Sequence, residues 1–348
     1  MIDKLHVGGA ENQVVLNLKH MDSLQFELYF TCFDKNSAML NQIPVHARQF
    51  IFTRKGKFDL QIIKKLRSTI QKSNIKIVHS HSFIDFLHSW FISLFCPVKV
   101  VQTIHGFWGK YHLNILKLLL KVKKIQLIAI SKELKKYLVQ NGLPENLISL
   151  VPNGIEFANW PLPAQMPDKK FSFGMVSRFG ASKDHLTVCK AVSILNKKIK
   201  SFEVHFWGQN ENIHGAAIKK YILENQLSNV LLHGETQNPA EKLGSLDVYI
   251  ASSFKETFGL SMVEAMAQKL PVIASNIPVF AEISENQKTS LLFETGNEND
   301  LAEKMELLIN NRELRIELGE KAFEAAKKYS IETTIQKLQD IYFDLLKK

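Results

Sequence analysis

The sequence has few cysteines, and they follow no metal-binding or redox pattern. Cys32, Cys96 and Cys189 are scattered through 348 residues, without CxxC or CxxH spacing. This spacing favours a reducing compartment and argues against a structural zinc site. The chain also lacks a GxGxxG fingerprint, which weighs against a dinucleotide-dependent dehydrogenase.

Long apolar runs are absent as well. Residues 1–20 contain no uninterrupted apolar core, so we expect no signal peptide. The most apolar run, residues 83–95, is too short to span a bilayer and carries Asp85 and His88. It predicts a buried helix. We therefore expect a cytoplasmic protein.

The net charge of +10 lies entirely in the first half of the chain. Residues 1–160 hold 21 lysines and arginines against 10 acids, a net +11, and residues 161–348 hold 23 against 24, a net −1. A basic half suggests an anionic partner, either nucleic acid or a membrane surface, although a generally lysine-rich composition is the simpler explanation. No nucleic-acid recognition motif and no alternation of aromatic with basic residues is present, so we expect no nucleic-acid partner.

Short apolar runs alternate with segments of helical periodicity, which predicts an α/β fold with parallel sheets. The expected strands lie within residues 26–33, 75–82, 98–106, 125–131, 147–155, 171–180, 202–208, 230–234, 247–252 and 271–275. Expected helices include 185–198, 240–245 and the whole tail from 301 to 348. The proline-rich stretch 161–170 predicts a linker. We therefore expect domains at 1–160 and 171–328 that face each other across a cleft, followed by a C-terminal helix at 329–348.

In wound parallel sheets, ligands bind at the carboxyl ends of strands. Arg178 follows the first strand of the second domain, and Lys183 lies near the start of the next helix. A guanidinium fork and a mobile ammonium beside a helix N-terminus suit a diphosphate. The alternative is a pair of surface cations.

The segment KETFGLSMVEA follows another strand at the same edge. Gly259 allows the backbone amides of Gly259 and Leu260 to approach an anion closely. Glu264 would lie one turn into the helix and could accept hydrogen bonds from a vicinal diol such as ribose, while Glu256 in the loop could bind hydroxyls at the other end of the ligand. The alternative is a solvated loop acid and an ordinary helix-surface glutamate.

In the first domain, His105 follows a strand at the expected cleft edge, and the Gly8-Gly9 pair predicts a tight turn with bare backbone. His79 and His81 alternate along a strand and would face the same side. Because no acidic or cysteine partner is near them in sequence, we expect no metal there.

These residues give the chain a resemblance to the retaining glycosyltransferases of family 4, which have the two-domain GT-B fold. The E-x7-E element from Glu256 to Glu264 is the most specific feature, and VHSHS, TIHG, AIS and VPNGIE follow the family's order along the first domain. The resemblance implies that Arg178 and Lys183 bind the donor diphosphate, and that no metal or other cofactor is needed. It also implies that the C-terminal helix at 329–348 crosses back and packs on the first domain.

The same resemblance gives a role to each remaining site residue. Glu264 would hold the donor ribose, and Glu256 would contact the donor sugar. The segment Phe258, Gly259 and Leu260 would face the diphosphate. His105 would lie beside the reacting sugar as a catalytic residue, together with Glu256, Arg178 and Lys183, and Gly9 would lie near the phosphate.

Three features depart from the family pattern. Only MIDKLHV precedes the glycines, where the family has a complete strand, so either this strand is shortened or the polypeptide begins upstream of Met1. The glycine that usually follows Gly208 two positions later is Asn210. The segment before Glu282 is SNIPVFAE, where the family is often glycine-rich.

The expected reaction is transfer of a hexosyl or N-acetylhexosaminyl group from a nucleotide diphosphate sugar to an acceptor hydroxyl with retention. Cell-surface polysaccharide or glycolipid assembly, such as lipopolysaccharide, capsule or O-antigen, is the expected setting. Two alternatives remain: a nucleotide-sugar epimerase of the same fold, and an inactive homologue that acts as a partner subunit.

The basic segment 110–126 mixes leucines and isoleucines with Lys117, Lys121, Lys123 and Lys124. A basic amphipathic segment of this kind can lie on an anionic bilayer, which would suit a lipid-linked acceptor as well as a saccharide one. The alternative is a helix with a solvated lysine face.

Overall fold

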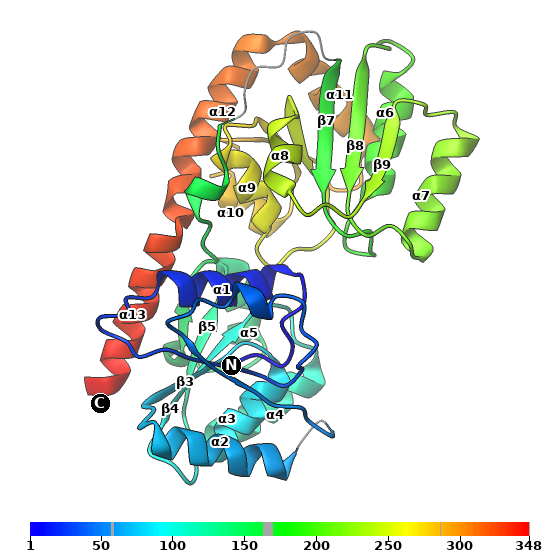
Figure 1. Ribbon diagram of the computed structural model, residues 1–348. Helices are drawn as coiled ribbons and strands as arrows, with labels where there is room; N and C mark the ends of the chain where they lie inside the picture. The colour runs from blue at the N-terminus through cyan, green and yellow to red at the C-terminus, as the bar shows by residue number, and fades with distance from the viewer. Residues whose placement is uncertain (57–58, 163–169, 286, 348) are drawn as a thin grey trace. The chain divides into compact units, whose positions relative to one another are not determined.

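The computed structural model describes residues 1–56, 59–162, 170–285 and 287–347, and the chain divides into two compact units (Figure 1). Unit 1 comprises Met1–Gly154 and Ile331–Lys348, and unit 2 comprises Ile155–Ser330. The boundaries expected from the sequence are at residues 160 and 329. Most of the expected linker, residues 163–169, lies outside the described residues.

Unit 1 is built on parallel strands covered by helices. A four-stranded sheet has the order β3-β4-β5-β6, and β1 pairs with β2 in a separate two-stranded sheet. The strands are β1 (Tyr29–Cys32), β2 (Arg48–Ile51), β3 (Ile77–Ser80), β4 (Lys99–Ile104), β5 (Gln126–Ala129) and β6 (Ile148–Leu150). The helices are α1 (Gly9–His20), α2 (Leu60–Lys72), α3 (Phe83–Ile92), α4 (Lys110–Val122), α5 (Lys132–Gln140) and α13 (Ile331–Lys347).

The predicted buried helix is α3, and its own sequence defines its start. Ser82 and Asp85 form a capping box, in which side chain and backbone satisfy each other's free groups. Phe86 and Trp90 are buried. Among the described residues, no helix is both long enough and apolar enough to cross a membrane.

The last helix, α13, belongs to the core of unit 1. Its Ile331, Ile335 and Leu338 pack with buried residues of the four-stranded sheet. A Cβ atom on Gly154 would lie 2.7 Å from the Ile331 Cα atom, so the chain needs a glycine where it passes under the start of this helix.

Unit 2 contains one six-stranded parallel sheet with the order β12-β11-β10-β7-β8-β9. The strands are β7 (Phe171–Val176), β8 (Phe202–Trp207), β9 (Val230–Gly234), β10 (Val248–Ala251), β11 (Val272–Ser275) and β12 (Leu291–Phe293). The helices are α6 (His185–Leu195), α7 (Ile213–Glu224), α8 (Pro239–Gly244), α9 (Leu260–Ala267), α10 (Pro278–Ile283), α11 (Glu298–Asn310) and α12 (Arg312–Ala326). Both units are thus Rossmann-like, as the sequence predicted.

Two strands were not predicted from the sequence, and the break between α11 and α12 was not predicted either. β2 has an exposed amino half, and β12 has only three residues, so neither forms a distinct apolar run. The tail predicted to be helical throughout is interrupted between α11 and α12 at Asn311, whose side chain caps α12, and again at Ser330, which is extended.

Candidate functional site

In the sheet of unit 2, the order in which the chain adds strands reverses between β7 and β10. From β7 the chain continues outward through β8 and β9, and it then crosses back to β10, which pairs with the other edge of β7. Connections on opposite sides of such a pair leave a crevice at the strands' carboxyl ends, where wound sheets bind ligands. Arg178 and Lys183 follow β7, and Glu256 follows β10, so the predicted site residues of unit 2 meet at this switch point.

Backbone hydrogen bonds join the loops that follow these two strands. The Asp184 amide donates to the Ser252 carbonyl at 3.1 Å, and the Phe254 amide donates to the Ser182 carbonyl at 2.9 Å. Lys183 and Ser253 form an isolated antiparallel bridge between the same loops. The two loops therefore form one support for the side chains they carry.

Lys183 and Glu256 form an ion pair in this support. Their side chains are 23% and 14% exposed, so the pair is largely shielded from water. Burial and the nearby charge of Arg178 lower the pKa of Lys183 to about 8. Arg178 is exposed at the end of the strand. The site thus holds two cations, of which one is partly desolvated and already paired with a carboxylate.

Gly259 forms the turn into α9. It has a left-handed conformation with φ of +86°, and a Cβ atom there would lie 2.6 Å from the Phe280 Cε1 atom. Helix α9 begins at Leu260, and its first amides have no partner within the helix. Phe258 is buried, and its ring packs edge-on against Tyr329 at 5.4 Å. Its side chain therefore anchors the turn.

Glu264 lies one turn into α9, as the spacing predicted. Burial raises the pKa of its carboxyl group to about 8. In the preceding turn, Ser261 accepts a hydrogen bond of 2.8 Å from the buried Tyr249 hydroxyl. Because burial causes this shift, the ionisation of Glu264 is sensitive to any ligand that supplies hydrogen-bond donors.

In unit 1, His105 lies directly after β4 and belongs to a row of three histidines. His105 Nε2 is 3.1 Å from His81 Nδ1, and the His79 and His81 rings stack at 4.2 Å. Burial lowers the pKa of His105 to about 4, and its Nδ1 atom has no partner in the described structure. His105 is therefore a neutral imidazole with one unpaired nitrogen.

His79 is fully engaged within unit 1. Its Nδ1 atom is 2.5 Å from the Tyr342 hydroxyl of α13, and its Nε2 atom is 2.7 Å from Thr103 Oγ1. Burial lowers its pKa, so both nitrogens serve in neutral hydrogen bonds. No cluster of three His, Cys, Asp or Glu suited to a metal occurs among the residues with described positions.

The glycine pair at the start of the chain forms the beginning of α1 and not the tight turn that the sequence predicted. Gly8 is the N-cap in an extended conformation, and Gly9 is the first helical residue and is exposed. A Cβ atom on Gly8 would approach only the carboxylate end of Glu11, at 2.4 Å. The bare backbone of Gly9 is thus accessible at a helix N-terminus.

The four lysines predicted to face a membrane do not share one environment. Lys121 and Lys124 are exposed, and Lys117 is half-buried. Lys123 is also half-buried, and its ammonium group donates to the Ser93 carbonyl at the end of α3. Burial and the nearby charge of Lys99 lower the pKa of Lys123.

Two features of the unit 2 site were missed at the sequence level. The His185 ring stacks on Phe179 at 3.8 Å, and its Nε2 atom is 3.2 Å from Ser177 Oγ. Burial lowers its pKa to about 3. The position of His185 two residues after Lys183 was the available signal.

The second feature lies at the ends of β8 and β10, where Gly208 was named only for the missing glycine two positions later and Ser252 was given no role. A Cβ atom on Gly208, whose φ is +148°, would lie 1.9 Å from the Ser177 carbonyl oxygen. Ser252 Oγ is buried without a partner in the described part of the chain. A glycine and a serine directly after strands were the signals that could have identified them.

Comparison with known proteins places each half of the chain in a described family. Residues 7–159 match the model "Glycosyltransferase Family 4", and residues 158–325 match "Glycosyl transferases group 1". An uncharacterized glycosyltransferase of Methanocaldococcus jannaschii is 26% identical over 98% of this chain and 95% of that protein. A capsular polysaccharide biosynthesis glycosyltransferase of Staphylococcus aureus is 27% identical over 71% of this chain and 69% of its own length.

Solved structures agree with the fold. A glycosyltransferase from Rickettsia africae has a TM-score of 0.88 at 21% identity and covers 100% of this chain and 98% of its own. The Anabaena protein HepE, solved in complex with UDP-glucose, has a TM-score of 0.85 at 17% identity and covers 99% of this chain and 98% of its own. The chain has the GT-B fold and belongs to glycosyltransferase family 4.

Proposed function

We propose that the protein transfers a hexosyl or N-acetylhexosaminyl group from a nucleotide diphosphate sugar to an acceptor hydroxyl, with retention at the anomeric carbon. The observation that carries this proposal is the arrangement at the switch point of unit 2. There Lys183 is paired with Glu256 beside the glycine that opens α9. Along the ligand, Glu256 would contact the sugar and Glu264 the ribose. Between them, the cations and the free amides at the start of α9 would contact the diphosphate.

Lys183 and Arg178 would neutralise the diphosphate as it leaves, with no metal involved. The free amides at the start of α9 would add fixed dipoles aimed at the same oxygens. In the structure, Glu256 forms an ion pair with the Lys183 ammonium group. Donor phosphates would take over that ammonium and release Glu256 for the sugar hydroxyls.

Glu264 would hold the ribose. Its carboxyl group lies one turn beyond the free amides, and its raised pKa reflects burial rather than an existing charged partner. The two hydroxyls of a ribose would supply hydrogen bonds that favour the ionised form. Binding of the nucleotide would therefore lower the pKa of Glu264.

Retention would follow from attack on the same face that the diphosphate leaves. The bond between the anomeric carbon and the diphosphate oxygen breaks, the bond to the acceptor oxygen forms, and the acceptor proton passes to the departing diphosphate. Stabilising charge on that leaving group is the main task of the site, and losing one such contact typically lowers the rate about 10²–10³-fold.

The test combines a panel of nucleotide sugars with two lysine variants. A donor is identified by thermal stabilisation, since a ligand that binds only the native state raises its stability. With this donor, Lys183→Ala should lower turnover at least about 100-fold. Lys190→Ala is the control and should retain activity, because Lys190 of α6 pairs with Glu298 of α11.

Near-normal turnover of Lys183→Ala would contradict the site assignment. Incubation with donor alone tests the chemistry further. A transferase should show slow hydrolysis of the donor, whereas formation of an epimer of the sugar would contradict the proposed transfer. The assembly of a cell-surface polysaccharide or glycolipid is the setting that we propose, because a capsular polysaccharide enzyme is among the relatives.

We further propose that unit 1 binds an anionic membrane surface. Beside the exposed Lys121 and Lys124, the side chains of Leu118 and Val122 are 62% and 66% exposed. The hydrogen bond from Lys123 to Ser93 joins the end of α4 to the end of α3. There Leu94 and Phe95 are also exposed. Apolar side chains beside lysines are typical of a surface that binds anionic lipid.

Vesicle sedimentation tests this membrane proposal. The Lys121→Glu/Lys124→Glu double variant should lose binding to anionic vesicles, because about 1 kcal/mol is expected per lysine near such a surface. The same charge change at Lys219 and Lys220 on α7 is the control. Equal binding of the unmodified protein to neutral and anionic vesicles would contradict the proposal.

A further inference from the structure

The two histidines of the VHSHS motif have no part in the proposed transfer, yet they are joined to His105. His79 lies in β3, His81 directly follows β3, and His105 directly follows the neighbouring strand β4. The His79 and His81 rings stack at 4.2 Å, as alternate residues facing one side can do. The His81 and His105 ring centroids are 5.4 Å apart, with 26° between the ring planes. The three rings therefore form a continuous row.

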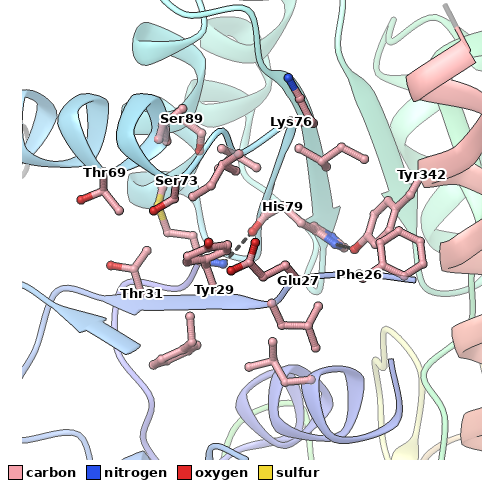
Figure 2. A pocket seen from close by; sticks show the side chains of 18 of the residues that line it. Phe26, Glu27, Tyr29, Thr31, Thr69, Ser73, Lys76, His79, Ser89 and Tyr342 are labelled. Carbon is pink, nitrogen blue, oxygen red and sulfur yellow. Dashed lines mark hydrogen bonds between the residues drawn. The ribbon is translucent and has the colours of Figure 1, made fainter. Parts of the chain in front are cut away.

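His79 anchors one end of this row. Figure 2 shows its side chain directed toward Tyr342 of α13, and its Nδ1 atom is 2.5 Å from that hydroxyl group. Its Nε2 atom is 2.7 Å from Thr103 Oγ1 of β4. Because hydroxyl groups on two other elements engage both nitrogens, the His79 ring cannot rotate without losing two hydrogen bonds. It is a fixed surface for the ring of His81.

His81, the middle member of the row, is held at its backbone and at its ring. The residue is 9% exposed, and its backbone amide donates to Asp85 Oδ2 at 2.9 Å. Its ring stacks on the fixed ring of His79. The direction of its Nδ1 atom is therefore defined, and this atom is 3.1 Å from His105 Nε2.

A hydrogen bond between two neutral imidazoles has a direction. Burial lowers the pKa of His81 well below 6.5 and lowers the pKa of His105 to about 4, so both rings are neutral near pH 7. A neutral imidazole has one N–H group and one bare nitrogen. Either His81 Nδ1 donates to His105 Nε2, or His105 Nε2 donates to His81 Nδ1.

The second nitrogen of His105 decides between these two directions. Its Nδ1 atom is buried and has no partner in the described part of the chain. If His81 donated, the His105 proton would lie on this Nδ1 atom and form a buried N–H group without an acceptor. Such groups are rare in proteins, and rarer than acceptors with an unused lone pair. The His105 proton is therefore on Nε2, which donates to His81 Nδ1.

We propose that His81 is a positioning residue, which holds His105 in the tautomer whose Nδ1 atom is a bare acceptor. The role in catalysis rests on the proposed function, in which His105 lies beside the reacting sugar. There a bare nitrogen accepts a hydrogen bond from a hydroxyl group and disfavours phosphate oxygens, which are acceptors themselves. His81 would thus determine which chemical group His105 binds, without touching that group.

Nuclear magnetic resonance of the full chain, labelled with 15N-histidine, tests the tautomer directly. Two-bond 1H–15N correlations distinguish protonated from bare ring nitrogens, and the His105 signals are those lost in His105→Gln. At pH 7 we expect a proton on His105 Nε2 and bare Nδ1 atoms in both His105 and His81. A proton on His105 Nδ1 would overturn the proposal. This measurement needs no donor and no activity, so its outcome is independent of the proposed transfer.

Substitutions of His81 test whether this residue sets the tautomer. Asparagine can offer its amide oxygen to His105 Nε2, whereas leucine has no acceptor. We expect a mixture of His105 tautomers in His81→Leu and the single original tautomer in His81→Asn. His79→Gln is the control, because His79 has no hydrogen bond to His105 among those described, and it should leave His105 unchanged. An unchanged His105 tautomer in His81→Leu would show that His81 does not position it.

Steady-state kinetics with the identified donor separates positioning from support of the fold. His81→Leu should lower kcat at least about tenfold, as loss of an orienting partner typically does, with a smaller change in KM. His81→Asn should retain most of the turnover. Unchanged kcat in His81→Leu, or an equal loss in both variants, would refute the positioning role. If the unmodified protein transfers no sugar from any donor, the proposed function fails, and the tautomer measurement still decides the state of His105.

Discussion

Glu264 should make the stability of unit 2 depend on pH. Its pKa is about 8 in the folded protein and 4.5 as an ordinary glutamate. Between these values the native state binds more protons than the unfolded state, so stability falls as pH rises. pH 7 lies about 2.5 units above the ordinary pKa of 4.5, and ionising Glu264 at that pH therefore lowers the unfolding free energy by about 3 kcal/mol.

The matched variant is Glu264→Gln, which resembles the protonated carboxyl group in shape and cannot ionise. At pH 5 the two proteins should melt within a few degrees of each other. At pH 7 the variant should melt roughly 6–12 °C higher, since about 1 kcal/mol shifts the melting temperature of a domain of this size by 2–4 °C.

Thermal unfolding monitored by calorimetry at pH 5, 6, 7 and 8 measures this difference. Glu317→Gln, at a glutamate that is 58% exposed on α12, is the control and should follow the unmodified protein at every pH. If the melting temperatures of the Glu264→Gln variant and the unmodified protein run parallel from pH 5 to 8, then burial does not perturb Glu264, and our reasoning about this carboxyl group is wrong.

Three further predictions concern single positions. Gly259→Ala should destabilise unit 2 by about 2 kcal/mol in chemical unfolding, because φ is +86° and the new Cβ would lie 2.6 Å from the Phe280 ring; an unchanged midpoint would contradict this. Because Lys183 has a pKa of about 8, binding of a nucleoside diphosphate should weaken at least about tenfold between pH 6.5 and 9.5 in titration calorimetry, and Lys183→Arg should remove this dependence. Gly154→Ala should lower the melting temperature of unit 1, since its Cβ would lie 2.7 Å from the backbone of Ile331. Gly109→Ala, with open space around it, should not lower it, and equal effects of the two substitutions would refute the close-packing argument.

Much of the fold was predictable because its strands are short apolar runs between polar helices. The ten expected strands each contain an observed one, and α3 is buried as its composition indicated. The missed strand β2 begins with the exposed residues Arg48 and Gln49, so it lacks the apolar run from which the other strands were predicted. The break between α11 and α12 was not predicted, because Asn311 caps a new helix instead of continuing the old one.

The candidate site could be predicted as far as residues near the carboxyl ends of strands could be identified. The spacing of Glu256 and Glu264 placed them correctly on the loop and the first turns of α9. The pairing of Lys183 with Glu256 was not predictable, because it depends on two loops that are 73 residues apart in sequence. Likewise, the stacking of His79 on His81 followed from strand alternation, but the hydrogen bond from His79 to Tyr342 depends on α13.

The division of unit 1 into two stretches of sequence has a consequence for biosynthesis. Val101, Ile128 and Val151 are buried against α13, yet Ile331–Lys347 is translated only after the whole of unit 2. Domains usually fold as they leave the ribosome, in order from the N-terminus. Here the contiguous unit 2 can complete its core first. The earlier-made unit 1 must keep an apolar surface open until the last helix has emerged.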